Sequence, residues 1–433
     1  MTEQYEVQGV GVTELAERYG TPLFVYDGTE LADRLTGLRG LLHPSMEVFF
    51  SLKSNPNVAV CALLHANGAR AEVSSMAELL TARQAGVAPE NVMFLGPGKS
   101  HAELEACLDE GIYTIICESY GELALIDQLA AARGLVTPVA LRINPAFSVK
   151  GSGLTMGGKP RQFGIDEAQL VDDPGLAGRY PNVRLMGVQV YLGTRFLDEE
   201  PIVENTRRIF ALAESLSARL GFSLELVDIG GGLGVAYFEG ERDLDIDLLA
   251  ARLNPVIEEF AGRHPGTRLV LEAGRYLTAR AGTYVTRVRY VKTSMGQNFA
   301  VVDGGTNHHM AAVGIGSFVK RDFPMRLLNR IDEPATESWS VAGPLCTPND
   351  VLGKKVALPP VRPGDLVGIL RSGAYGPTAS PVLFLSHGYP AEVLVHNGRA
   401  HLVSERDQPA DLLRRQHLPL DVAELTAARP THR

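Results

Sequence analysis

The chain has 433 residues, a net charge of −9 and an apolar content of 45%, a composition typical of a globular protein with about two or three domains. The acidic balance and the lack of a basic stripe argue against nucleic acid as a partner. The first residues lack the basic and apolar regions of a signal peptide, and no apolar run reaches the ~18 residues that a membrane helix needs. We therefore expect no association with a membrane.

Cysteine usage indicates a reducing compartment. The four cysteines, Cys61, Cys107, Cys117 and Cys346, form no C-x-x-C pair, and their spacing suits neither a zinc site nor a disulfide framework. The sequence therefore predicts a cytoplasmic protein. The first three cysteines lie in apolar segments and are expected to fill the core. Cys346 lies between Gly-Pro-Leu and Thr-Pro, in a loop, where a thiol is more often functional.

The chain begins with a predicted helix at 12–19 and an apolar strand at 22–26, and it then alternates strands with helices. Near-continuous apolar runs, typical of parallel strands covered by helices, occupy residues 46–52, 69–74, 91–96, 113–118, 137–144, 184–193, 223–229 and 268–272. Three intervening helices begin with capping-box sequences, at Ser75, Ser100 and Ser119. Eight β/α units over roughly 230 residues predict a (β/α)8 TIM barrel, with a doubly wound open sheet as the alternative.

The pattern changes after residue 275. Strands separated by turn residues are predicted at 281–291, 298–302, 339–342, 365–370 and 391–395, which indicates an all-β domain. The strand at 22–26 is expected to pair with it. The predicted organisation is an N-terminal segment over 1–30, a barrel over 31–275 and a C-terminal β-domain over 276–433. The connection after the fifth barrel strand, with Gly151-Ser152-Gly153 and 157–160, is too long to be an idle loop.

Lys53 is the first candidate for chemistry, because catalytic groups of a (β/α)8 barrel gather at the carboxyl ends of the strands. It directly follows an apolar strand. An amine held there can lose its proton readily and act as a nucleophile that forms a Schiff base. An ordinary lysine that reaches out to water is the alternative.

Further polar residues are expected at the same mouth. Gly230, Gly231 and Gly232 follow the seventh strand, where backbone amides can bind a phosphate; a simple tight turn is the alternative. Glu272 ends the eighth strand, and Arg275 follows it. Together these groups suit pyridoxal 5′-phosphate, whose ring nitrogen a carboxylate keeps protonated. Alternatively, Glu272 and Arg275 form an ion pair that braces the rim.

Two other patterns bear on ligand binding. The glycine run matches neither the dinucleotide fingerprint nor the P-loop. His308 and His309 are adjacent, and adjacent side chains on a strand point to opposite faces. We therefore expect no metal site, and expect instead a satisfied histidine or a substrate contact.

Ordered motifs extend this interpretation over nearly the whole chain, from about Thr21 to Val395. They are Phe50-Ser-Leu-Lys53-Ser-Asn, Asp228-Ile-Gly-Gly-Gly232, Glu272-Ala-Gly-Arg275, Gly343-Pro-Leu-Cys346 and Ser372-Gly-Ala-Tyr375-Gly. With them the chain resembles the fold-type III pyridoxal-phosphate-dependent decarboxylases, the group of ornithine, arginine and diaminopimelate decarboxylases. The resemblance implies a barrel with a C-terminal β-domain, and a head-to-tail homodimer with its active site at the subunit interface.

The resemblance also implies roles for single residues. Lys53 corresponds to the Schiff-base lysine, and Glu272 to the partner of the pyridine nitrogen. Cys346 corresponds to the cysteine that the second subunit inserts to reprotonate the substrate carbon. The remaining implied cofactor contacts are Glu72 and Arg142 near the ring, Tyr191 at the stacking position, and Thr194, Gly230, Gly231, Gly232, Arg275 and Tyr375 at the phosphate.

The chain departs from the family pattern at two positions. Tyr191 stands where a histidine usually stacks on the ring, and Thr347 stands where diaminopimelate decarboxylases commonly have an acidic residue. The contacts for a distal amine are also not obvious after Asp303. These departures argue against free lysine, ornithine and diaminopimelate as substrates.

A narrower resemblance suggests another substrate. Residues 158–166, 190–194, 302–309, 342–350 and 380–387 resemble the branch of the family that acts, in butirosin biosynthesis, on glutamate held as a thioester on an acyl-carrier protein. The sequence therefore predicts a carboxy-lyase of secondary metabolism that acts on a carrier-bound aminoacyl group. The alternatives are a decarboxylase of a free amino acid, a racemase on a related barrel, and a non-catalytic homologue.

Overall fold

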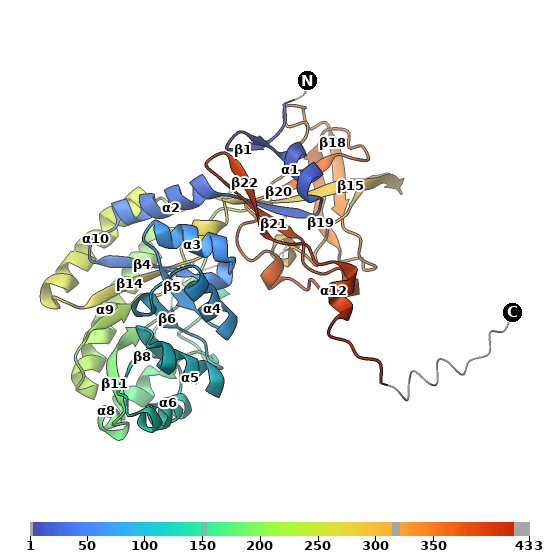
Figure 1. The fold of residues 1–433 in the computed structure, drawn as a ribbon. Helices are drawn as coiled ribbons and strands as arrows, with labels where there is room; N and C mark the ends of the chain where they lie inside the picture. Colours follow the sequence, from blue (N-terminus) through green and yellow to red (C-terminus); the bar gives the residue numbers. More distant parts are fainter. Residues whose placement is uncertain (1–2, 149–150, 152–153, 314–320, 420–433) are drawn as a thin grey trace.

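The structure is a computed structural model that describes residues 3–148, 151, 154–313 and 321–419. A barrel and a β-domain lie side by side, joined by strands and loops that pass between them (Figure 1). Ser152 and Gly153 of the predicted long connection lie outside the described residues. No helix in the described ranges combines the length and apolar character needed to span a membrane.

Within the described residues, eight parallel strands close into a barrel. Their order is β4-β5-β6-β7-β8-β11-β13-β14, and the pairing of β14 with β4 completes the ring. The strands are β4 (Met46–Ser51), β5 (Arg70–Val73), β6 (Val92–Phe94), β7 (Thr114–Cys117), β8 (Thr137–Asn144), β11 (Val183–Gln189), β13 (Leu226–Asp228) and β14 (Arg268–Ala273). Each overlaps its predicted run, so the barrel is confirmed and the open doubly wound sheet is wrong.

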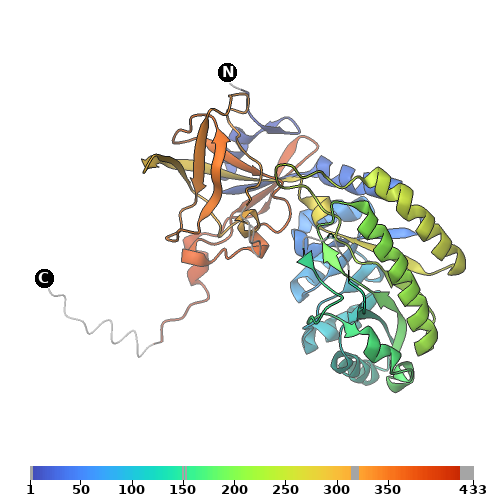
Figure 2. The ribbon, with the colours of Figure 1, turned by 180° about the vertical axis from the view of Figure 1, so that it is seen from behind.

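Helices cover the outside of the barrel and connect successive strands (Figures 1 and 2). They are α2 (Gly28–Leu41), α3 (Val58–Ala66), α4 (Met76–Gln84), α5 (His101–Glu110), α6 (Tyr120–Arg133), α7 (Glu167–Val171), α8 (Leu176–Arg179), α9 (Glu199–Leu220), α10 (Ile246–Arg263) and α11 (Arg275–Thr278). Side chains such as Phe49, Met93, Ile116 and Val270 form a buried cluster contributed by different strands. The strands are buried on both faces, which explains their uninterrupted apolar runs.

The three predicted capping boxes differ in detail. At Ser100 the box is reciprocal, because the Ser100 hydroxyl accepts from the Glu103 amide and the Glu103 carboxylate accepts from the Ser100 amide. Ser75 and Ser119 also cap their helices. Their glutamates, however, accept a hydrogen bond from the amide of the residue before the cap. These two glutamates therefore tie the helix starts to the ends of β5 and β7.

The β-domain is built around β15 (Gly282–Ser294), which pairs with β3, β16 and β20. Its other strands are β16 (Gln297–Val302), β17 (Met325–Leu327), β18 (Glu337–Ala342), β19 (Val351–Leu358), β20 (Leu366–Leu370), β21 (Ala391–His396) and β22 (Arg399–Ser404). β17, β19 and β22 were not predicted. β17 is short, β19 is interrupted by Lys355 at a φ of 55°, and β22 is largely exposed, so none presents a clear apolar run.

The N-terminal segment adds a strand to the β-domain and leads into the first helix of the barrel. After β1 (Glu6–Val7), β2 (Val10–Gly11) and α1 (Val12–Tyr19), the strand expected at 22–26 is β3 (Leu23–Asp27). It pairs antiparallel with β15 and parallel with β21. Asp27 then caps α2, the first barrel helix, so the chain passes directly from the β-domain into the barrel. A short helix, α12 (Pro409–Leu413), lies near the end of the described chain.

Candidate active site

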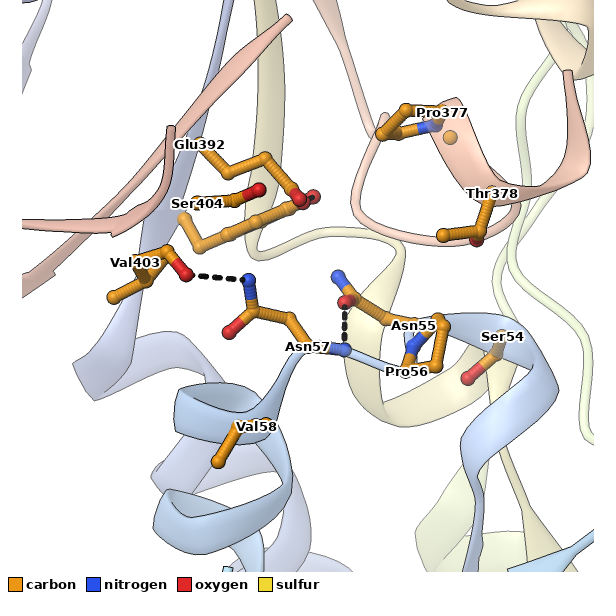
Figure 3. Close-up of a pocket in the computed structure, with 12 residues that line it drawn as sticks. Ser54, Asn55, Pro56, Asn57, Val58, Pro377, Thr378, Glu392, Val403 and Ser404 are labelled. Carbon is orange, nitrogen blue, oxygen red and sulfur yellow. Dashed lines mark hydrogen bonds between the residues drawn. The ribbon is translucent and has the colours of Figure 1, made fainter. Parts of the chain in front are cut away.

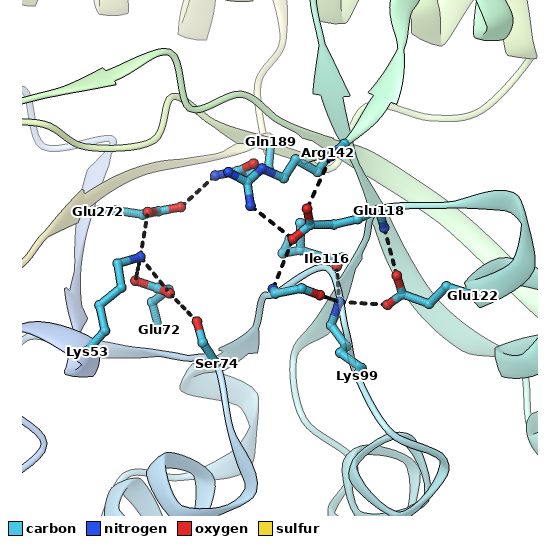
Figure 4. Close-up of polar contacts among 12 residues, drawn as sticks. Lys53, Glu72, Ser74, Lys99, Ile116, Glu118, Glu122, Arg142, Gln189 and Glu272 are labelled. Atoms are coloured by element: carbon cyan, nitrogen blue, oxygen red, sulfur yellow. Dashed lines mark hydrogen bonds and ion pairs between the residues drawn. The ribbon is translucent and has the colours of Figure 1, made fainter. Parts of the chain in front are cut away.

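Lys53 lies at the mouth of the barrel, in a single 3-10 turn after β4. Its Nζ is 3.2 and 3.1 Å from the two carboxylate oxygens of buried Glu72, and 4.0 Å from Glu272 Oε2 (Figure 4). Burial acts to lower the pKa of Lys53, but the charges of Glu72 and Glu272 outweigh it and raise this pKa above its ordinary value. The amine is therefore held as an ammonium, contrary to the expectation of a readily lost proton.

Glu272 lies within a buried polar group that sequence reasoning only partly found. The Gln189 side-chain amide donates to Glu272 Oε1 at 2.8 Å. Asp228, at the end of β13, accepts from the Gly230 amide through Oδ1, and its Oδ2 has no partner in the described structure. The sequence assigned no role to Gln189, and Asp228 entered only as the first residue of the glycine motif. The available signal was that each ends an apolar strand, and Asp228 begins the glycine motif.

The two carboxyl groups do not both ionise. Burial, and then the negative charge of Glu272, raise the pKa of Asp228 well above its usual range. Burial and the charge of Glu72 also raise the pKa of Glu272, while Lys53 and Gln189 oppose that rise. Because Glu272 has cationic and amide partners and Asp228 Oδ2 has none, Asp228 is the member that holds a proton.

Beside this group lies a small cavity with an arginine in its lining, which we call the anion cavity. This cavity of about 20 Å³ is lined by residues that include Thr194, Gly231, Gly232, Arg275 and Tyr375. The Arg275 guanidinium donates to the Tyr237 hydroxyl at 3.3 Å, and its Nε has no acceptor in the described structure. The alternative interpretation, an ion pair between Arg275 and Glu272, is wrong, because Glu272 contacts Gln189 and Lys53 instead.

The glycine triplet is both a tight turn and a source of free amides. Gly232 has a φ of 103°, and a Cβ on Gly231 would lie 2.2 Å from the Glu272 carbonyl oxygen. Only glycine fits such positions. The amides of Gly231 and Gly232 have no acceptor within the described residues, whereas the Gly230 amide donates to Asp228. Two of the three predicted amides are therefore free for an anion.

Tyr375 reaches this cavity from the β-domain. It has a φ of 55°, which is unusual for a residue other than glycine and persists only where the surroundings impose it. Its amide donates to the Ser54 carbonyl at 2.7 Å. The Arg275 guanidinium lies 4.6 Å from the centre of its ring. The segment that follows Lys53 thus fixes the tyrosine that closes the anion cavity.

A larger cavity of about 450 Å³ opens from the same residues. It is lined by Lys53, Ser74, Leu95, Gly96, Pro97, Arg142, Leu154, Met156, Phe163, Gln189, Tyr191, Thr194, Glu272, Arg275 and Tyr375. This volume falls within the usual range of small-molecule sites. Lys53 Nζ lies 5.8 Å from the centre of the Tyr191 ring, so the tyrosine forms a wall beside the amine.

Arg142 is positioned at this cavity by Glu118. Arg142 donates to Glu118 Oε1 at 2.9 Å (Figure 4). Its guanidinium lies 4.6 Å from the centre of the Phe163 ring. Glu118 also accepts from the amides of Gly96 and Gly164 at 3.0 and 3.1 Å. One buried carboxylate therefore fixes the arginine and two loops of the mouth.

The described part of the long connection after β8 forms one wall of the site. β9 (Leu154–Thr155) pairs antiparallel with β12 (Gly193–Thr194), and the Met156 amide donates to the Leu192 carbonyl at 2.8 Å. Leu154, Met156 and Phe163 line the larger cavity. This pairing also positions Thr194 beside the anion cavity.

Cys346 is a predicted site residue that the single chain leaves away from both cavities. It is exposed and belongs to the lining of neither. Its loop is braced by buried Asp350, which accepts from the amides of Leu345 and Thr306 at 2.8 and 2.7 Å. Cys61, Cys107 and Cys117 are buried core residues, as expected.

His308 and His309 lie in a turn after β16, and not on a strand as the sequence argument assumed. Each ring is buried, with His308 Nε2 3.0 Å from the Gly388 carbonyl oxygen and His309 Nε2 2.9 Å from the Ser372 hydroxyl. Burial lowers their pKa values to about 4 and about 3, so both rings are neutral. His308 is a satisfied core histidine, whereas the buried Nδ1 of His309 has no partner in the described structure. No group of side chains able to hold a metal ion occurs in the described part of the chain.

The donor set fits pyridoxal phosphate. Arg275 without a carboxylate partner, the free amides of Gly231 and Gly232, and the Tyr375 hydroxyl suit a phosphate group. The Lys53 amine, between both cavities, suits an aldehyde. Glu272, a buried carboxylate in the lining of both cavities, suits a protonated ring nitrogen.

Comparisons with known proteins agree with this fit. A family model described as "Pyridoxal-dependent decarboxylase, pyridoxal binding domain" matches residues 30–279. The L-glutamyl-[BtrI acyl-carrier protein] decarboxylase of Niallia circulans is 39% identical over 94% of this chain and 96% of its own length. The diaminopimelate decarboxylase of Aquifex aeolicus is 29% identical over 93% of both chains. The crystal structure of the M. jannaschii diaminopimelate decarboxylase with L-lysine matches with a TM-score of 0.89 and 27% identity, over 97% of both chains. The chain therefore belongs to the pyridoxal-phosphate-dependent decarboxylases of amino acids.

Proposed function

We propose that this decarboxylase acts on a glutamyl-like aminoacyl group carried on an acyl-carrier protein, in the biosynthesis of an antibiotic or a similar secondary metabolite. The observation that carries the proposal is the 39% identity with the Niallia circulans enzyme over 94% of the chain. The Aquifex aeolicus diaminopimelate decarboxylase is 29% identical over a similar length. The same chain is thus more similar to a protein named for a carrier-bound substrate.

Charge on the long loop supports an anionic partner. Lys159 and Arg161 are exposed and follow Met156, which lines the cavity. A carrier-bound substrate would bring the phosphodiester of its prosthetic arm toward this loop. Exposed cations beside a site entrance favour the approach of such a group.

For the cofactor, we propose that Lys53 Nζ bonds to its aldehyde and that Glu272 pairs with its ring nitrogen. Arg275, Tyr375 and Thr194, together with the Gly231 and Gly232 amides, would bind its phosphate, while Gly230 holds the turn. When bound, the cofactor supplies the electron sink for the electron pair that departing CO2 leaves on the substrate carbon.

The other residues would bind and move protons. Glu72, 3.1 Å from Lys53 Nζ, is placed to accept the proton that this amine must lose before it reacts. Tyr191 and Arg142 would form walls beside the ring. Cys346 of the partner subunit would return a proton to the substrate carbon.

A homodimer with a shared active site is part of this proposal. Its support is that Cys346 is exposed on a braced loop and lies outside the cavities of its own chain. A cytoplasmic location, expected from the cysteines, remains a prediction.

A decarboxylase of a free amino acid is the second candidate. It is favoured by relatives named diaminopimelate decarboxylase, such as the 32% identical protein of Pseudomonas fluorescens. Membership of the decarboxylase family argues against the racemase and the non-catalytic homologue.

The test is CO2 release from carboxyl-labelled substrates, with Lys53→Ala protein as the background. Glutamate loaded on an acyl-carrier protein is compared with free glutamate, diaminopimelate, lysine and ornithine. The proposal predicts turnover of the loaded substrate and little of the free ones. Efficient turnover of free diaminopimelate, with none of the loaded substrate, would overturn it in favour of the second candidate.

A further inference from the structure

A second pocket lies between the barrel and the β-domain, outside the site described above (Figure 3). Its volume is about 230 Å³. It is lined by Tyr26, Ser54, Asn55, Pro56, Asn57, Val58, Gly376, Pro377, Thr378, Glu392, Val403 and Ser404. Residues 54–58 come from the barrel, and the others come from β3 and the β-domain. An occupant would therefore contact both parts of the molecule.

Glu392 gives this pocket its charge. Of the described residues that line the pocket, Glu392 alone has an ionisable carboxyl group, and no lysine or arginine accompanies it. It is 8% exposed and accepts a hydrogen bond from the Tyr26 hydroxyl at 2.5 Å. Burial raises the pKa of Glu392, and only the neutral side chains of Tyr26, Ser404 and Asn57 oppose the rise. A buried carboxylate without a cation is costly, so Glu392 either keeps a proton or pairs with a cation that enters the pocket.

The remaining lining groups define the shape of that counterion. Asn57, Val403 and Ser404 present oxygen atoms on the side of Glu392, while Pro377 and Thr378 lie across the opening (Figure 3). The Asn57 side-chain amide donates to the Val403 carbonyl at 3.4 Å, which is a long hydrogen bond. Pro56, Val58 and Pro377 contribute carbon surface. The space is far larger than a bare metal ion needs, and smaller than the ~300–1,000 Å³ of a drug-sized site.

We propose that this pocket binds a small alkylammonium ion, with its N–H groups on Glu392, Ser404 and the Val403 carbonyl and its alkyl chain against Pro377 and Val58. Decarboxylation of a free amino acid, the second candidate function above, removes its carboxylate and leaves an amine of this class. A carboxylate pocket without a cation would admit such an amine and repel the amino acid from which it came.

The pocket is coupled to the active site through the chain. Ser54 directly follows Lys53, and Gly376 directly follows Tyr375. The Tyr375 amide donates to the Ser54 carbonyl, and the Asn55 side chain donates to the Gly373 carbonyl at 3.0 Å. An occupant that bridges residues 54–58 and Glu392 would therefore stabilise the contact that holds Tyr375 in place.

The test uses the holoenzyme and the N,N-dimethylpropylammonium ion. This tertiary amine carries the charge and one N–H group, which is enough for the contact with Glu392, and it cannot condense with the cofactor aldehyde. Isothermal titration should show saturable binding, and the unfolding temperature should rise with its concentration. Butyrate, an anion of similar size, should produce neither effect. Absence of saturation up to tens of millimolar, or equal binding of butyrate, would overturn the proposal.

Matched variants locate the binding. Glu392→Gln should weaken binding by about tenfold or more, because a hydrogen bond to a charge is lost. Glu405→Gln removes the same charge from an exposed residue beside Ser404 and should bind as the unmodified protein does. If Glu392→Gln fails to fold, Thr378→Trp blocks the exposed mouth of the pocket without touching the carboxylate. This variant should abolish the heat of binding in the titration. Unchanged affinity in Glu392→Gln or Thr378→Trp would show that the ion binds elsewhere.

Discussion

At the scale of single residues, the site depends on carboxyl groups with unequal protonation. Glu72 carries the charge that holds Lys53 as an ammonium, and Glu272 is stabilised as an anion by Lys53 and Gln189. Asp228, beside Glu272 and without a donor on Oδ2, holds a proton. This division keeps a negative charge on Glu272, where a protonated ring nitrogen needs it, while Asp228 adds no further charge beside it.

The raised pKa of Asp228 predicts a pH dependence of stability. The folded chain keeps a proton that the unfolded aspartate loses above about pH 4, so this group makes the folded chain less stable as pH rises. Asp228→Asn mimics the protonated form, since its oxygen can accept from Gly230 and its amide can donate to Glu272. In urea unfolding of the cofactor-free protein, the stability of Asp228→Asn relative to the unmodified chain should increase between about pH 5 and pH 8. Asp247→Asn, at an exposed aspartate, should show no such trend. If the stabilities of Asp228→Asn and the unmodified chain instead change in parallel with pH, the assignment of a proton to Asp228 is contradicted.

The sequence predicts which residues form the site better than it predicts their protonation states. Lys53, Glu272 and Arg275 were predictable because charged residues interrupt apolar strands at their ends. The protonation of Lys53 was not, because it depends on Glu72, which the pairing of Ser51 with Glu72 across β4 and β5 brings close. Such a contact follows from sheet register, which the local pattern does not specify.

At the scale of elements, Glu118 connects three segments of the barrel mouth. From the end of β7 it binds Arg142 on β8, the Gly96 amide after β6 and the Gly164 amide on the long connection. The Arg142–Glu118 pair is buried, with side chains 8% and 1% exposed. Removal of either partner from such a buried pair destabilises the protein far more than removal of one partner from a surface pair.

Glu118→Gln should therefore lower the free energy of unfolding by about 3–5 kcal/mol, because Arg142 loses its counterion inside the protein and an amide replaces an acceptor. Glu225→Gln provides the comparison, since its pair with Arg184 has side chains 44% and 45% exposed. That change should cost less than about 1 kcal/mol. Urea unfolding of both variants measures the difference, and equal losses would show that Glu118 is not the connecting residue.

Regular elements were largely predictable, and the elements of the site were only partly so. Barrel strands such as β7, buried on both faces, give unbroken apolar runs. The short pair formed by β9 and β12 gives no such signal, because two-residue strands carry no period. The length of the connection after β8 still indicated that this segment had a role.

At the scale of the whole molecule, the site is assembled from two parts of one chain and, in our proposal, from a second chain. β3 and Tyr375 link the β-domain to the barrel next to Lys53. Cys346, on the same β-domain, lies outside the cavities. Fold class was predictable from the strand count, but the convergence of Tyr375 on Arg275 was not, because it depends on how the two parts pack.

Hybrid dimers test the contribution of a second chain. Lys53→Ala and Cys346→Ala proteins should each have little activity alone. After mixing under conditions that exchange subunits, a hybrid dimer contains one site with a native lysine and a native cysteine, because each comes from a different chain. CO2 release should therefore recover on mixing. No recovery, with exchange verified by native mass spectrometry, would contradict an active site shared between subunits.

The position of the cofactor on the chain can be measured directly. Borohydride reduction of the holoenzyme fixes the bond between lysine and cofactor, and mass spectrometry of the digested protein then locates the added pyridoxyl group. It should lie on the peptide that contains Lys53. Lys99, whose buried amine is occupied by Glu122 and by the carbonyls of Gly96 and Ile116, should remain unmodified. A pyridoxyl group on Lys99 or any other lysine, with Lys53 unmodified, would contradict the assignment of Lys53 and the site built around it.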